Sequence, residues 1–167
     1  QYPYLVRDGF IPQSEWDNWG NGESILRVFA NNEIPGIDVT SGSLGHGIGI
    51  SAGITLANRA DSIDRKNFVI ISEGELYEGS TWESLLFVAH HKLHEVKIIL
   101  DVNRNMILGR PEDQLSLESI DNKLTSFNFN VKRIDGHDFD EISRGLSFLT
   151  NNNISPSVLI ADTVKGK

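Results

Sequence analysis

Two short apolar runs, at residues 68–71 and 96–100, flank a segment of helical periodicity in the middle of the chain. Both runs have the length of a buried strand and are rich in β-branched residues. Residues 79–93 lie between them, with Ser80 or Thr81 as candidate caps at the start of the helix. Their apolar positions at helical spacing are Trp82, Leu85, Leu86, Ala89 and Leu93. The pattern predicts a right-handed strand–helix–strand crossover with parallel strands.

The remainder of the chain continues this alternation. We expect further strands at 128–134 and 157–161, and helices at 48–58, 118–127 and 139–149. Residues 1–43 contain more loops, and there we expect only short helical segments, near residues 4–6, 12–16 and 24–29. The alternation predicts an α/β fold, a doubly wound and mostly parallel sheet with helices on both faces. At this length, we expect a single domain spanning residues 1–167.

Polar residues follow both central strands. Glu73-Gly74-Glu75 comes after the first strand, and Asp101-Val102-Asn103 comes after the second. Because parallel strands end at the same edge of a sheet, we expect both loops to lie where open α/β sheets bind ligands. Oxygen donors from adjacent loops suit Mg²⁺, and glycine lets backbone approach a diphosphate closely. The alternative interpretation is ordinary turn chemistry.

A glycine-rich segment, residues 41–47, precedes the helix expected at 48–58. Each glycine costs a helix about 1 kcal/mol relative to alanine, so Gly47, Gly49 and Gly53 together need a reason. Close packing or a loop that wraps a ligand supplies one, and a simple turn is the alternative. His46 has two interpretations: a group facing a cofactor or substrate, or a helix-capping residue, which is the one we favour.

Composition narrows the class of partners. Hydrophobic residues make up 39% and the formal net charge is −8, which argues against nucleic acid as a partner. No apolar run reaches the roughly 20 residues that a membrane span needs, and no signal peptide is evident. The chain has 0 cysteines, and we expect a cytoplasmic protein. His90 and His94 have zinc-binding spacing, but we favour a solvated end of a helix.

The central segment resembles transketolases, which carry Gly-Asp-Gly, then Glu-Gly, a helix, and D-x-N. In this chain Ser72-Glu73 stands where that family has Gly-Asp. Residues 42–47 are similar to the family's G-P-L-G-Q-G, residues 135–138 to its D-G-H-D, and residues 163–167 to its T-x-K-G-K. The matching central segments are Ser72-Glu73-Gly74, Glu78-Gly79, Trp82-Glu83 and Asp101-Val102-Asn103.

The resemblance implies the thiamine diphosphate-binding fold, with Mg²⁺ and thiamine diphosphate as cofactors. The implied metal ligands are the side chains of Glu73 and Asn103 and the backbone carbonyl of Asn105. Gly74 and Asn103 would also contact the cofactor, as would the loop residues Gly42, Ser43 and Leu44. Glu78 is the implied catalytic residue, near the surface that meets the partner. Asp138 is explained as a helix N-cap without a catalytic role.

The implied reaction is transfer of a two-carbon ketol unit between sugar phosphates, in carbohydrate metabolism. The acid that activates the aminopyrimidine lies on another domain in this family. The resemblance therefore implies a pyrimidine-binding C-terminal partner subunit, with a dimer or larger oligomer as the assembly. It also implies that terminal family segments are absent from this chain. The alternative is a non-catalytic or cofactor-impaired scaffold that keeps the fold.

Overall fold

The computed structural model describes residues 1–107 and 109–166, so Lys167 of the T-x-K-G-K segment lies outside the described residues. The chain divides into two compact units, Gln1–Ser43 and Leu44–Lys167. Each unit has its own core, and the single domain expected over residues 1–167 stays a prediction. No helix among the described residues is long and apolar enough to cross a lipid bilayer.

The first unit contains α1 (Tyr2–Arg7) and α2 (Gln13–Asp17) around a small apolar core. The helical turn predicted at residues 24–29 is wrong. There the Glu15 carboxylate accepts hydrogen bonds from the Ser24 hydroxyl at 3.0 Å and from the Ile25 backbone N–H at 2.8 Å. The Glu15 side chain thus fastens the start of this segment, which runs as a loop, to α2. The core residues of this unit are Ile11, Leu26, Ile34 and Ile37.

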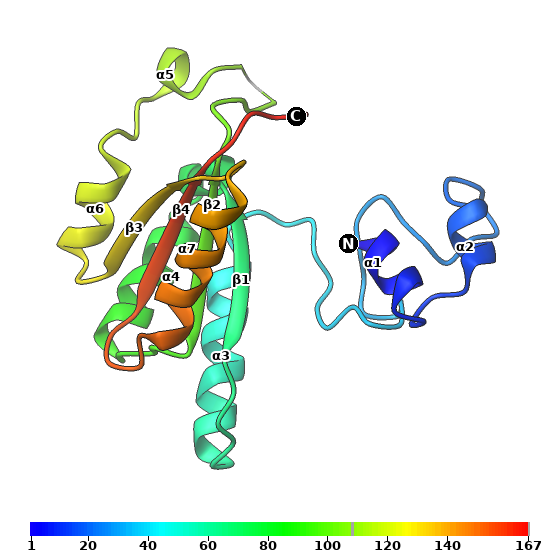
Figure 1. Ribbon diagram of the computed structural model, residues 1–167, viewed down its shortest axis with the longest axis horizontal. Helices are drawn as coiled ribbons and strands as arrows, with labels where there is room; N and C mark the ends of the chain where they lie inside the picture. Colours follow the sequence, from blue (N-terminus) through cyan, green and yellow to red (C-terminus); the bar gives the residue numbers. More distant parts are fainter. Residues whose placement is uncertain (108, 167) are drawn as a thin grey trace. The chain divides into compact units, whose positions relative to one another are not determined.

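The second unit is built on a four-stranded sheet in the order β1-β2-β4-β3 (Figure 1). All three strand pairings are parallel, which confirms the predicted α/β fold and the central crossover. The strands are β1 (Asn67–Ser72), β2 (Val96–Val102), β3 (Asn130–Asp135) and β4 (Ser157–Asp162). The helices are α3 (Gly47–Ala60), α4 (Gly79–His90), α5 (Pro111–Gln114), α6 (Ile120–Ser126) and α7 (Phe139–Asn151), with a 3₁₀ helix η1 (Glu73–Tyr77).

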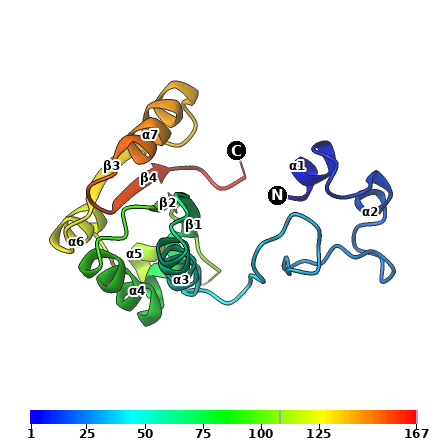
Figure 2. The same ribbon diagram turned by 90° about the horizontal axis from the view of Figure 1, so that it is seen from below.

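Helices cover both faces of this sheet, with α3 and α4 on one side and α7 on the other (Figure 2). Alternation along the strands sorts the side chains, so that Ile98 and Leu100 of β2 join the core under α3 and α4. Ile99, between them, packs with Leu159 and Leu149 against α7. The run at residues 96–100 is therefore a strand buried on both faces, whereas the run at 68–71 forms the edge strand β1 and leaves Phe68 and Ile70 exposed.

The predicted cap of α4 is wrong. Glu78 occupies the N-cap position and its side chain makes no capping hydrogen bond. The Thr81 hydroxyl instead donates to the backbone carbonyl of Glu75 at 2.6 Å, which ties α4 to the loop after β1. The predicted N-cap at Asp138 is confirmed, because its side chain accepts from the Glu141 backbone N–H at 2.9 Å.

The close packing of α7 predicts opposite effects for two glycine-to-alanine substitutions. A Cβ at Gly145 would lie 2.8 and 2.9 Å from the two terminal methyls of Leu159, which is only 2% exposed. Gly145→Ala should therefore lower the free energy of unfolding by about 1–3 kcal/mol through overpacking. In α3, a Cβ at Gly53 would meet no heavy atom within 4 Å. Gly53→Ala should therefore raise the free energy of unfolding by up to about 1 kcal/mol.

Urea denaturation of the two variants and the unsubstituted chain measures both effects. Equal stabilisation by the two substitutions would contradict the packing of α7 against Leu159, since helix propensity alone favours alanine at both positions.

Candidate functional site

The loops after β1 and β2 lie side by side at the carboxyl edge of the sheet, because the two strands pair in parallel with Ser72 opposite Asp101. The Glu73 side chain joins them: its Oε2 accepts the backbone N–H of Arg104 at 2.9 Å. Arg104 has a left-handed backbone, with φ of 55°, which is uncommon outside glycine. This contact brings the Glu73 carboxylate to the Asn103–Asn105 loop, as the crossover predicted.

Glu73 is a buried carboxylate, with 6% of its surface exposed. Burial raises the pKa of Glu73, while the Arg104 N–H and side-chain charge lower it and the nearby Glu118 and Glu112 raise it further. Glu73 takes part in none of the ion pairs found among the described residues. A carboxylate held in this way without a paired cation has the charge and the oxygen donors that a divalent cation needs.

Asn103 is held at both ends of its side-chain amide. Its Nδ2 donates to Asp101 Oδ2 at 3.0 Å, and its Oδ1 accepts the backbone N–H of Asn105 at 3.0 Å. The three predicted metal ligands Glu73, Asn103 and Asn105 therefore belong to one hydrogen-bonded pair of loops. Their role as metal ligands stays a prediction.

The segment that leads into α3 is fastened to the same edge by Glu75. One carboxylate oxygen of Glu75 accepts the backbone N–H of Gly45 at 3.1 Å, and the other accepts that of Ser72 at 3.0 Å. Gly45 has φ of 82°, and a Cβ there would lie 2.7 Å from the Cβ of Glu78, so only glycine fits. Sequence reasoning missed Glu75, although the Ser72-x-x-Glu75 capping box is a recognisable signal.

The predicted cofactor residues are distributed over both units. Gly42 and Ser43 end the first unit, Leu44 begins the second, and their contact with a cofactor stays a prediction. At Gly74 the nearest heavy atom to an added Cβ would be Ser72 Oγ at 3.6 Å, so the protein's own packing does not require a glycine. Open space above a backbone beside Glu73 is compatible with close approach of a ligand.

A pocket of about 200 Å³ opens beside Glu73 and is lined by Arg104, Glu112, Glu118 and other residues of the 111–120 segment. The lining thus includes three acidic residues, Glu73, Glu112 and Glu118, and one basic residue, Arg104. Glu78, the predicted catalytic residue, lies exposed at the start of α4 next to Gly45.

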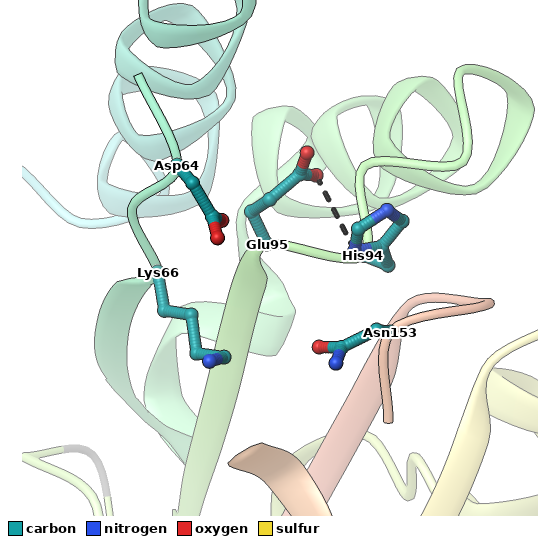
Figure 3. Close-up of a pocket in the computed structure, with 5 residues that line it drawn as sticks. All are labelled: Asp64, Lys66, His94, Glu95 and Asn153. Atoms are coloured by element: carbon teal, nitrogen blue, oxygen red, sulfur yellow. Dashed lines mark ion pairs between the residues drawn. The ribbon is translucent and has the colours of Figure 1, made fainter. Parts of the chain in front are cut away.

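Another pocket lies at the amino ends of the strands, far along the sheet from these loops (Figure 3). It is lined by Asp64, Lys66, His94, Glu95 and Asn153, and His94 Nδ1 lies 3.8 Å from Glu95 Oε2. Among the described residues, no three His, Cys, Asp or Glu side chains group closely enough to hold a metal ion. His46, which we expected to cap a helix, is exposed at the N-cap position of α3, but its side chain makes no capping hydrogen bond.

The family model and the relatives described below all point to one family of proteins. Residues 29–167 match the family model described as "Transketolase, thiamine diphosphate binding domain". The chain is 36% identical over 166 residues to an apulose-4-phosphate transketolase subunit of Phocaeicola vulgatus, covering 99% of this chain and 59% of that protein. It is 34% identical to the 6-deoxy-6-sulfo-D-fructose transketolase subunit SqwG of a Clostridium species, covering 99% and 61%.

Solved structures agree with this result. A transketolase from Campylobacter jejuni superposes with a TM-score of 0.73 at 28% identity, covering 78% of this chain and 22% of that one. A transketolase variant from Pichia stipitis superposes with a TM-score of 0.90 over 97% of this chain and 26% of that one, at 22% identity, which shows the fold alone. The chain spans about 60% of the curated subunits it matches.

The burial of Glu73 predicts a stabilising substitution. Burial raises the pKa of Glu73, so ionising this carboxyl costs the folded chain more free energy than it costs the unfolded chain. Glu73→Gln should raise the melting temperature of the metal-free chain, because the amide keeps an oxygen that accepts from Arg104 N–H. The gain should shrink as the pH falls through the raised pKa of Glu73, where the native carboxyl takes up a proton.

Thermal unfolding monitored by circular dichroism across that pH range measures the difference. The exposed Glu83 of α4 provides the matched control, since Glu83→Gln changes charge identically without changing a buried group. Destabilisation by Glu73→Gln at neutral pH would show that the carboxylate charge stabilises this fold.

Proposed function

This chain belongs to the transketolase thiamine diphosphate-binding domain family, and we propose that it is the cofactor-binding part of a two-subunit transketolase. The proposed reaction is transfer of a two-carbon ketol unit between sugar phosphates. The observation that carries the proposal is the hydrogen bond from Arg104 N–H to Glu73, which joins the two loops of the family motif at one sheet edge. We further propose that both compact units belong to one cofactor-binding domain.

The residues at this edge fit Mg²⁺ by their chemistry. Glu73 and Asn103 would offer side-chain oxygens and Asn105 its backbone carbonyl, all hard donors of the kind Mg²⁺ prefers. The buried Glu73 carboxylate supports this assignment because it has no ion-pair partner among the described side chains. Gly74 would bring its backbone to the diphosphate, where an added Cβ would meet only Ser72 Oγ within 4 Å.

Thiamine diphosphate, when bound, supplies the carbon nucleophile for ketol transfer. The chain's own residues would bind and orient its diphosphate end, with Gly42, Ser43 and Leu44 as additional contacts. Glu78 would act at the surface shared with a partner, which its exposure and its place at the start of α4 support. We propose that a pyrimidine-binding subunit completes the site, since two relatives are themselves named as single subunits of a transketolase.

A non-catalytic scaffold is the competing proposal, and one observation favours it. Glu73 stands where the family has aspartate, and its carboxylate already accepts a hydrogen bond from the chain's own backbone. Its extra methylene must be accommodated within the near-ideal octahedral geometry of Mg²⁺.

The cytoplasmic location expected from composition stays a prediction.

Calorimetric titration of thiamine diphosphate in the presence of Mg²⁺ separates the two proposals. We expect saturable binding that requires Mg²⁺ and tightens when a pyrimidine-binding subunit from the same source is added. Glu73→Gln should weaken it roughly tenfold or more by removing a charged ligand, while Glu23→Gln, at an exposed position outside the matching segments, should not.

Absence of binding both with and without the second subunit would overturn the transketolase proposal and favour a scaffold. Glu73→Asp gives a further comparison: tighter binding than in the unsubstituted chain identifies Glu73 as a ligand of compromised geometry, and unchanged affinity argues against a metal role for this position.

A further inference from the structure

The side chain of Asp101 connects two loops at the candidate site. Its Oδ2 accepts a hydrogen from Asn103 Nδ2 at 3.0 Å, and its Oδ1 accepts the hydroxyl of Thr163 in a short hydrogen bond. Asp101 lies near the end of β2, opposite Ser72 of β1 and Ala161 of β4. It is therefore fixed at the point where three neighbouring strands end.

This contact decides which end of the Asn103 amide faces the site. An ionised carboxylate has only acceptors, so it selects the NH₂ group of the amide and turns the oxygen away from itself. The oxygen accepts one hydrogen bond, from Asn105 N–H at 3.0 Å, and an amide oxygen has a second lone pair. This second lone pair of the Asn103 oxygen is free to coordinate a cation.

Thr163 prevents the Asp101 carboxylate from turning. Its backbone N–H donates to the Val102 carbonyl at 3.0 Å, which fastens the end of β4 to the end of β2. Its hydroxyl then occupies the Asp101 oxygen that Asn103 does not use. The preceding residue, Asp162, is itself held by Arg133 through two hydrogen bonds of 2.7 and 2.8 Å.

We infer that Asp101 is a positioning residue that orients Asn103 as a ligand for a divalent cation, and that Thr163 locks Asp101 in place. This inference rests on the proposed function, because it assigns Asn103 to the cofactor-linked Mg²⁺. Neither Asp101 nor Thr163 touches the cofactor in this assignment. Their contribution is to fix the direction of one oxygen atom, as the partners of metal ligands commonly do.

Asp101→Asn tests the inference with little change in shape. An amide at this position has one acceptor oxygen instead of two and no charge, so the acceptor that selects the NH₂ end of Asn103 is weakened, and Thr163 keeps its contact only by accepting from the new NH₂ group. With the full chain and saturating thiamine diphosphate, we expect the affinity for Mn²⁺, followed by electron paramagnetic resonance, to fall roughly 10–100-fold.

The matched control is Asp135→Asn, at the end of β3. It makes the same change of charge at the same sheet edge, but the Asp135 carboxylate accepts only from the His137 backbone N–H among the described contacts. Equal Mn²⁺ affinity in the Asp101→Asn and Asp135→Asn variants would overturn the inference while leaving the proposed function intact. Failure of the unsubstituted chain to bind Mn²⁺ with the cofactor, both alone and with the second subunit present, would overturn both.

A second pair of variants separates positioning from general loss of structure. Thr163→Ser keeps the hydroxyl and should retain the affinity, whereas Thr163→Val keeps the shape, removes the donor and should lose several-fold. A readout independent of metal is the pair of side-chain NH₂ proton resonances of Asn103 in the metal-free chain. They should shift in Asp101→Asn and not in Asp135→Asn, and unchanged resonances in Asp101→Asn would overturn the inference.

Discussion

Parallel pairing of β1 with β2, in a register that sets Ser72 opposite Asp101, is the constraint on which the candidate site depends. It places the first residues after each strand at one edge and within reach of each other. Glu73 then spans the two loops by accepting the Arg104 N–H, and Arg104 adopts a left-handed backbone there. A shift of β2 by one residue against β1 would turn Asp101 to the face of the sheet opposite to that of Ser72.

Acidic side chains join the loops at this edge to one another, in addition to the apolar packing of Leu76 in the core. Glu73, Glu75 and Asp101 each accept hydrogen bonds from backbone or side-chain donors of a neighbouring loop. Hydrogen bonds to charged acceptors are worth about 1.5–3 kcal/mol each, which at Glu75 and Asp101 can help to order a short polar loop, whereas at Glu73 burial of the carboxylate offsets this gain. Their directionality also fixes positions more narrowly than apolar contacts, which suits a site that must hold a ligand.

Local pattern was sufficient to predict the strands, the crossover and the meeting of Glu73 with the Asn103–Asn105 loop. Periodicity and strand length are properties of neighbouring residues, and parallel topology follows from the intervening helix. Residues whose partners are distant in sequence could not be found in that way. Glu75 reaches back 30 residues to Gly45, and Asp101 reaches forward 62 residues to Thr163.

Two predictions made from local sequence were wrong, the cap of α4 and the helical turn at residues 24–29, and both have the same origin. Ser80 and Thr81 both satisfy the composition rule for an N-cap, but Thr81 uses its hydroxyl on the Glu75 carbonyl, a contact that exists only once η1 has formed. At residues 24–29 the Glu15 carboxylate binds the Ser24 hydroxyl and the Ile25 N–H and fastens the segment to α2 as a loop. Tertiary contacts thus replaced the local preference in each case.

The negative charge around the site means that the proposed cation and the cofactor must bind together. Glu73, Glu112 and Glu118 line the pocket at the site, Arg104 is their one basic neighbour within that lining, and the whole chain carries a formal charge of −8. A diphosphate approaching these carboxylates alone would be repelled, because like charges a few ångströms apart disfavour each other. Under the proposed function, a divalent cation reverses that interaction by binding to both. Cation and cofactor must then raise each other's affinity by the same factor, as linkage requires of any two ligands that share a site.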